Sequence, residues 1–240
     1  MDRPLIIAHR ARLPGVPEHA ISSLPALAEA GADIVEIDVR LSLDRKPVVH
    51  HDAFLGRTTR GRGWVRLWPA FLLRRLPLRG SPAGDRVAPL SEMLKAMPAG
   101  LQPGLHLKDR GALRATLRAI ARHGDPDRTW LWLERPRDVL AATRRFPGIR
   151  CTLLRAGGWT PSSRQQYLHD ARRTGARAIS VPWGVVTDDL TQAAHAHGLL
   201  VFAVQEPSAS IAQVVAAGLD GIITSDPANA RQEVERLLGA

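Results

Sequence analysis

The chain has 240 residues, of which 45% are hydrophobic and 23% are charged, and its formal net charge is +10 at pH 7. This length suits one well-buried core, and the composition is typical of a soluble globular protein. The sequence excludes a membrane-spanning helix, because no apolar run approaches ~20 residues, and an internal disulfide, because Cys151 is the single cysteine. The first apolar run, residues 5–8, is too short for a secretory signal. These features predict a cytoplasmic protein.

The positive charge is carried mainly by arginine. A strongly basic chain often binds an acidic partner such as nucleic acid, a membrane surface or a phosphorylated substrate. Only three of the 33 basic residues are lysines (Lys46, Lys95 and Lys108), and the arginines are spread over the whole length. Charge spread in this way indicates a solvated basic surface rather than a binding stripe, so we expect no nucleic-acid partner. The sequence predicts no particular oligomeric state.

From one end of the chain to the other, apolar runs of strand type alternate with helical patterns. We predict strands at residues 5–8, 33–39, 104–108, 129–133, 150–154, 178–181, 200–204 and 221–224. We predict helices at residues 21–30, 90–97, 112–123, 136–145, 163–174, 188–197, 211–217 and 227–238. Glycines stand where five of these helices should end, and each is followed shortly by a strand: Gly31, Gly124, Gly175, Gly198 and Gly218.

Eight strand–helix units in a chain of this length predict the fold. The expected class is α/β, a TIM-type (β/α)8 barrel formed by residues 1–240 as a single domain. A doubly wound open sheet is the alternative. It would normally carry a glycine-rich phosphate loop after its first strand, and the sequence has no such loop there, which disfavours the open sheet.

One segment, about residues 41–89, interrupts the alternation after the second strand. It contains a further extended run at residues 47–52. We interpret the segment as an insertion at the carboxyl end of strand 2. Strand ends and loops from several units build the active site at this end of a barrel, so the insertion is expected to lie beside the site.

The insertion interleaves arginines with Trp64, Trp68 and Phe71. Arginine beside tryptophan is typical of segments that contact anionic lipid, so peripheral membrane contact is one interpretation. The other is a short helix from Pro69 to about Arg75, in which Phe71 and Leu72 cover the barrel. We favour the covering role.

Residues 33–40 place two carboxylates on one side of a strand. Successive side chains of a strand face opposite sides, so Glu36 and Asp38 point the same way. On an interior face, two carboxylates repel each other and are costly to desolvate unless a cation, a proton or an arginine compensates them. Glu36 and Asp38 are therefore site candidates. Other polar side chains should emerge at the same end of the barrel: His9, Arg10, His106 and Lys108.

Several short motifs follow one another near the start of the chain: residues 7–10, 17–18, 30–39, 48–52 and 55–59. In their order and spacing they resemble the glycerophosphodiester phosphodiesterase family. Residues 218–227 are similar to the closing strand of that family, whereas residues 110–200 resemble it only in architecture. The resemblance implies a barrel with a divalent cation, Mg²⁺ or Ca²⁺. It also implies that a small-molecule glycerophosphodiester is hydrolysed to glycerol 3-phosphate and an alcohol.

The residue types in these motifs suit that reaction. Breaking a phosphodiester needs a base, an acid for the departing alkoxide, and positive charge near the phosphate oxygens. Imidazole titrates near neutral pH, so we predict His9 and His51 as the catalytic acid–base pair. Carboxylates supply hard oxygens, so we predict Glu36 and Asp38 as metal ligands. The predicted substrate-binding residues are Arg10 and Lys108, which can hold phosphate oxygens, together with Glu18 and Phe202.

The last two residues have separate arguments. Glu18 either orients a catalytic group or caps a helix near Ile21. Phe202 stands where the family has a tryptophan-threonine-valine-asparagine run, and it is a candidate wall for the leaving alcohol. Loops after the fourth to seventh strands should contact the leaving alcohol and determine which alcohol is accepted. The resemblance is poorest in these loops, so the sequence does not identify the alcohol.

The chain also departs from the family pattern. Ala11 replaces a glycine, His19 and Ala20 replace asparagine and threonine, and Leu133-Glu134 replaces a serine-phenylalanine strand end. These departures leave an alternative function open: a divergent barrel, weak or inactive in catalysis, that binds a phosphorylated ligand.

The departure with the largest chemical consequence is His106, which replaces a glutamate two residues before Lys108. Strand alternation places His106 inward beside Glu36 and Asp38. As a third metal ligand, an imidazole shifts the preference from Mg²⁺ or Ca²⁺ toward Mn²⁺ or Zn²⁺. Alternatively, His106 fills the barrel as a cation paired with Glu36 in place of a metal. The sequence leaves both interpretations open.

Overall fold

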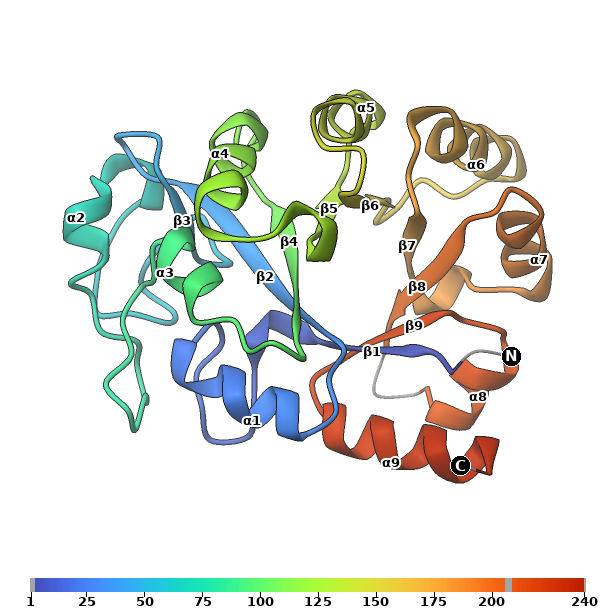
Figure 1. Cartoon of the computed structure of the whole chain (residues 1–240), viewed down its shortest axis with the longest axis horizontal. Helices are drawn as coiled ribbons and strands as arrows, with labels where there is room; N and C mark the ends of the chain where they lie inside the picture. The colour runs from blue at the N-terminus through green and yellow to red at the C-terminus, as the bar shows by residue number, and fades with distance from the viewer. Residues whose placement is uncertain (1–2, 206–208, 240) are drawn as a thin grey trace.

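Parallel strands close on themselves into a barrel, with helices outside (Figure 1). The computed structural model describes residues 3–205 and 209–239. Within them eight parallel strands run in the order β1-β9-β8-β7-β6-β5-β4-β2, and β1 pairs with β2 to complete the circle. This confirms the predicted (β/α)8 barrel and excludes the open sheet. The barrel strands are β1 (Leu5–Ala8), β2 (Ile34–Leu41), β4 (Gln102–Leu107), β5 (Trp130–Leu133), β6 (Arg150–Leu154), β7 (Ala178–Pro182), β8 (Leu200–Val204) and β9 (Gly221–Thr224).

A helix follows each barrel strand. The predicted helix at residues 21–30 begins as a 3-10 turn, Ile21–Ser23, and continues as an α-helix. The predicted bounds at residues 136–145 and 227–238 agree with the structure to the residue. The helices that cover the barrel are α1 (Leu24–Glu29), α3 (Leu90–Lys95), α4 (Leu113–His123), α5 (Pro136–Arg145), α6 (Pro161–Thr174), α7 (Asp188–Ala196), α8 (Ile211–Ala216) and α9 (Pro227–Leu238).

Large aromatic side chains fill the interior of the barrel. The rings of Trp130 and Phe202 lie 5.2 Å apart between centroids, and those of Trp132 and Phe202 lie 6.0 Å apart. Two glycines make room for them, Gly104 on β4 beside β5 and Gly221 on β9 beside β8. A Cβ at Gly104 would lie 2.6 Å from Trp132, and a Cβ at Gly221 would lie 2.5 Å from Phe202, both inside van der Waals contact.

The position of Phe202 corrects one prediction. Its side chain is 0% exposed within this aromatic cluster, so Phe202 does not form a wall for the substrate. Strand alternation is consistent with a side chain on the interior face of the barrel. It does not give the position of that side chain along the barrel axis. The next inward residue along β8, Val204, lies one layer closer to the carboxyl end and reaches the cavity described below.

The insertion has a small hydrophobic core of its own. It contains β3 (Pro47–Val49), which pairs antiparallel with the end of β2, a 3-10 turn (Val65–Leu67) and α2 (Ala70–Leu73). Ala70 and Leu73 are buried, whereas Phe71 is 56% exposed. The predicted short helix is present, but its buried residues pack in this core. The prediction that Phe71 covers the barrel is wrong, and Leu72 is half-buried. The buried residues of this core are Ala20, Val48, Leu55, Val65, Ala70, Leu73, Leu78 and Val87.

None of the helices within residues 3–205 and 209–239 has the length and apolar character that a bilayer span requires.

The glycine at position 104 provides a test of the barrel interior. We expect Gly104→Ala to lower the free energy of unfolding by about 1–3 kcal/mol, because the new methyl group overpacks against Trp132 and Ile34. Urea denaturation measures the change. Gly100→Ala is the matched control, since a Cβ there meets nothing within 4 Å. Equal stability of the two variants would contradict the packing argument.

Candidate functional site

A cavity of about 150 Å³ opens at the carboxyl ends of the barrel strands. Seven of the nine predicted site residues line it, and the other two, Glu18 and Phe202, do not. Four segments supply the seven: the end of β1, the interior face of β2, the residues after β3 and the end of β4. The seven are His9, Arg10, Glu36, Asp38, His51, His106 and Lys108.

Glu36, Asp38 and His106 form a group that could hold a metal ion. One potential ligand atom from each lies within 4.8 Å of the others. His106 Nδ1 is 3.3 Å from Asp38 Oδ1 and 3.6 Å from Glu36 Oε1. Ligand atoms bound at about 2.1 Å to one tetrahedral ion would be separated by about 3.4 Å, so the three residues fit a divalent cation.

Asp38 is also surrounded by nitrogen groups. His19 Nε2 lies 3.0 Å from Oδ2, Lys108 Nζ lies 3.5 Å from Oδ1, and Arg10 Nε lies 3.9 Å from Oδ2. Burial alone would raise the pKa of this carboxyl, but the contacts with His106, His19 and Lys108 hold the pKa of Asp38 well below its usual range. Asp38 is therefore an anion at neutral pH although it is only 1% exposed.

His19 is a site residue that the sequence analysis named only as a departure from the family. It is buried, and its backbone has a φ of +63°. Residues other than glycine rarely adopt this left-handed conformation, and histidine is among the few that do so more often, with asparagine and aspartate. The N–H of His19 donates to the carbonyl of Arg10 over 2.8 Å, which secures the turn that carries the side chain to Asp38. The replacement of asparagine at this position was the signal available in the sequence.

A chain of hydrogen bonds and ion pairs runs from His51 back to Arg10. Asp52 accepts from His51 Nδ1 over 2.6 Å and from Arg57 Nε over 2.5 Å. Arg57 also pairs with Glu18, and Glu18 lies 3.5 Å from Arg10 Nη1. Hydrogen bonds from Arg57 and His51 outweigh the effect of burial and lower the pKa of Asp52 to about 2.

The chain of contacts also decides the role of Glu18. The 3-10 turn at Ile21 and the helix α1 both begin without a side-chain cap, so the capping alternative is wrong. Glu18 instead holds two arginines beside the cavity, and Arg57 lowers the pKa of Glu18 against the effect of burial. Asp52 and Arg57 were missed in the sequence analysis, although both lie inside the quoted motifs. The contact that links them to the rest of the site, Arg57 with Glu18, joins residues that are distant along the chain.

His9 differs from His51 in its surroundings. Burial lowers the pKa of His9 below its usual value, although Glu36 opposes this shift. The ring is consequently neutral at pH 7 and can accept a proton. The neighbouring histidine of the second motif, His50, has its ring nitrogens close to the Asp52 carbonyl and the Thr58 hydroxyl, which indicates a structural role.

Residues 9–108 match the model of the Glycerophosphoryl diester phosphodiesterase family. A glycerophosphodiester phosphodiesterase of Caldanaerobacter subterraneus subsp. tengcongensis is 25% identical over 237 residues, covering 94% of this chain and 95% of the relative. One of Bacillus subtilis is 45% identical over 65 residues, covering 27% of this chain and 22% of the relative.

Solved structures resemble the chain over almost its full length. An Oleispira antarctica phosphodiesterase, solved in complex with the product sn-glycerol-3-phosphate, superposes with a TM-score of 0.85 at 21% identity and 97% coverage of both chains. A putative glycerophosphoryl diester phosphodiesterase from Silicibacter pomeroyi gives a TM-score of 0.85 at 20% identity, covering 99% of this chain and 95% of the other. These likenesses confirm the barrel. The sequence matches show that the chain is similar to the glycerophosphodiester phosphodiesterase family, most clearly over residues 9–108.

Proposed function

We propose that this protein hydrolyses a glycerophosphodiester to glycerol 3-phosphate and an alcohol. The observation that carries the proposal is the meeting of two histidines, a Glu/Asp/His ligand group and two cationic side chains around one cavity. Phosphodiester hydrolysis needs groups that transfer protons, groups that compensate the developing charge and groups that bind the phosphate oxygens. Similarity to the glycerophosphodiester phosphodiesterase family supports the same reaction.

The two histidines have different roles in the proposed mechanism. His9 is neutral at pH 7 and accepts the proton of the attacking oxygen. The imidazolium form of His51 donates its Nδ1–H to the anionic Asp52 and transfers its Nε2 proton to the departing alkoxide. Arg10 and Lys108 hold phosphate oxygens, the first through its planar fork and the second as a point charge.

Glu36, Asp38 and His106 are proposed to hold a divalent cation, which when bound would polarise the phosphate and compensate its developing charge. A set of two carboxylates and one imidazole suits Mn²⁺ or Zn²⁺ better than the oxygen-preferring Mg²⁺ and Ca²⁺. One oxygen of Glu36 is already engaged, because Oε2 accepts the N–H of Arg10 over 2.9 Å. Oε1 remains for the cation.

A second candidate is a barrel that binds a phosphorylated ligand without turnover. The observation in its favour is that Asp38 already has nitrogen partners on both oxygens. A site whose negative charge is compensated in this way can be stable without a metal. Arg10 and Lys108 would then bind the phosphate group of the ligand without taking part in a reaction.

The insertion adds a proposed membrane contact. Five of the seven large hydrophobic side chains that are exposed in the described residues lie in it: Leu43, Phe54, Trp64, Leu67 and Phe71. We call these five the apolar face. The rings of Phe54 and Trp64 are 3.9 Å apart, and the guanidinium of Arg66 lies over Trp64 at 5.1 Å. Aromatic rings among arginines suit the surface of an anionic bilayer. The cytoplasmic location and the absence of a nucleic-acid partner remain predictions.

Replacing either proposed acid–base residue should abolish most of the activity. We expect His9→Ala and His51→Ala each to lower kcat on glycerophosphocholine at least ~10²-fold, the loss typical of general acid–base catalysis. His169→Ala, at an exposed histidine of α6, is the control and should retain full turnover. Full activity in either site variant would remove that residue from the mechanism. A wild type that binds phosphate but hydrolyses no diester with any divalent metal would favour the second candidate.

The ligand role of His106 predicts the metal content. We expect elemental analysis of the purified protein to find Mn²⁺ or Zn²⁺ and a chelator to remove activity. His106→Glu restores an all-oxygen set, so it should shift activation toward Mg²⁺ or Ca²⁺ while metal stays bound. His169→Glu, on the exposed surface, should leave the metal preference unchanged. A wild type that is metal-free and fully active would exclude the ligand role.

Sedimentation with vesicles tests the membrane contact. We expect the protein to bind phosphatidylglycerol vesicles at low salt, to bind phosphatidylcholine vesicles weakly, and to be released by salt. Replacing Trp64 and Leu67 together by serine should weaken binding, because both side chains belong to the apolar face. Leu237→Ser, at an exposed leucine of α9, is the matched control. No binding to anionic vesicles at low salt would exclude this contact.

A further inference from the structure

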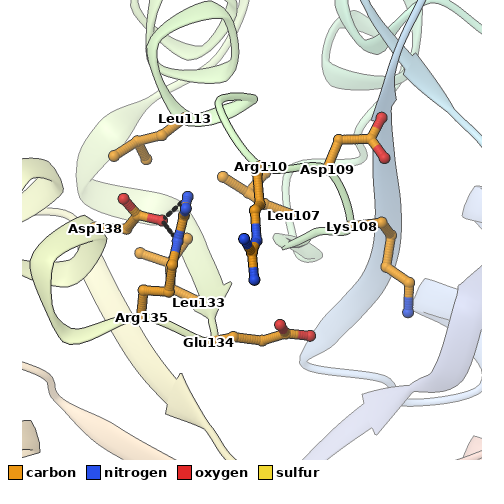
Figure 2. A pocket seen from close by; sticks show the side chains of 9 residues that line it. All are labelled: Leu107, Lys108, Asp109, Arg110, Leu113, Leu133, Glu134, Arg135 and Asp138. Carbon is orange, nitrogen blue, oxygen red and sulfur yellow. Dashed lines mark hydrogen bonds and ion pairs between the residues drawn. The ribbon is translucent and has the colours of Figure 1, made fainter. Parts of the chain in front are cut away.

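A second cavity of about 140 Å³ adjoins the first, between the carboxyl ends of β4 and β5 (Figure 2). Lys108 lines both cavities. The apolar part of the second lining consists of Leu107, Leu113 and Leu133. The polar part contains Arg110 and Glu134, which follow the ends of the two strands. This polar pocket is in contact with the proposed phosphate site through one side chain.

Most charges of the polar pocket are compensated by neighbours. Asp109 accepts from Arg40 Nη1 and from the N–H of Leu41, each over 2.7 Å. Asp138 accepts from Arg135 Nε over 2.7 Å. These contacts hold both carboxylates at the edge of the pocket, so they are not available to a ligand.

Arg110 and Glu134 are different. Both are exposed, and among residues 3–205 and 209–239 neither has a side-chain hydrogen bond or an ion pair. Figure 2 shows the Arg110 guanidinium extending into the pocket above the Glu134 side chain, with the Glu134 carboxylate turned toward the side where Lys108 lies. The pocket therefore offers one free donor group and one free acceptor group, and together they carry no net charge.

The two cavities meet at one side chain, because Lys108 lines both. A phosphate group held by Lys108 therefore has one of its organic arms within reach of the polar pocket. If the glycerol phosphate occupies the first cavity, the alcohol extends past Lys108 into the polar pocket.

The lining indicates what kind of alcohol fits. A hydroxyl group both donates and accepts a hydrogen bond, so adjacent hydroxyls match a free carboxylate beside a free guanidinium. A quaternary ammonium is usually recognised over aromatic faces, and the described lining of this pocket is aliphatic apart from its charged groups. A primary amine would meet Glu134 but would be repelled by Arg110.

We propose that the polar pocket binds a polyhydroxylated leaving alcohol of the glycerol or inositol type, with Glu134 accepting and Arg110 donating hydrogen bonds to its hydroxyls. This inference rests on the proposed phosphodiesterase function and names the substrate class for it. The departure at Leu133-Glu134 then determines specificity rather than weakening the site.

The test compares substrates that differ only in the alcohol. Wild type, Glu134→Leu and Arg110→Leu are assayed with glycerophosphoglycerol, glycerophosphoinositol and glycerophosphocholine. We expect kcat/KM of the wild type to be higher for the polyol esters. Each variant should lose about tenfold or more on these esters, the range for a hydrogen bond to a charged group, and change less than about threefold on the choline ester. Arg137→Leu, an exposed arginine of α5 outside the pocket, should behave as wild type.

The outcomes separate this inference from the proposed function. An active wild type without polyol preference, or variants that lose activity equally on all three esters, would overturn the inference alone. A wild type inactive on every ester speaks against the proposed function, and binding then decides. A rise in melting temperature with glycerophosphoglycerol that exceeds the rise with glycerophosphocholine, and that Glu134→Leu abolishes, would support the polar pocket. Equal rises would overturn it.

Discussion

The site depends on keeping Asp38 charged inside the barrel. A buried carboxylate without partners costs several kcal/mol, and a second carboxylate on the same strand face raises that cost. The structure compensates Asp38 with three groups from two other segments: His19 from the loop after β1, and His106 and Lys108 from the end of β4. The elements that meet around this residue are also those that line the cavity. The same arrangement that stabilises the anion thus assembles the site.

The loop after β1 has to be strained to provide these partners. Arg10 and Ala11 have φ values of +57° and +47°, in the left-handed region that costs an L-residue about 1–2 kcal/mol. Specific hydrogen bonds offset that cost. The N–H of Arg10 donates to Glu36, and the buried hydroxyl of Ser23 donates to the carbonyls of Ala11 and Ala20, each over 2.8 Å. Glycine at position 11, as in the family, would avoid part of the strain, so Ala11 is tolerated because its surroundings fix the backbone.

Local patterns in the sequence were sufficient to predict the fold. Together with the family motifs they predicted seven of the residues that line the cavity. Strands such as Leu200–Val204 and Gly221–Thr224 agree to the residue, because a short apolar run after a helix-ending glycine is a strong local signal. Alternation along β2 correctly put Glu36 and Asp38 on one face. Phe202 was assigned to the cavity from the resemblance to the family, which does not give depth along the barrel axis, and it lies below the cavity. Contacts between distant segments, such as Arg57 with Glu18, have no local signature at all.

The insertion explains why His51 can act in a site otherwise built from barrel strands. β3 pairs with β2 beyond the buried carboxylates, and the chain then turns back so that His51 lines the cavity. Arg40 of β2 fixes this turn, because its Nε donates to the His51 carbonyl over 2.8 Å. The small core around Val48 and Leu55 packs this segment and so supports the proposed catalytic role of His51. The apolar face belongs to the same segment, so the proposed membrane contact would orient the cavity mouth relative to the bilayer.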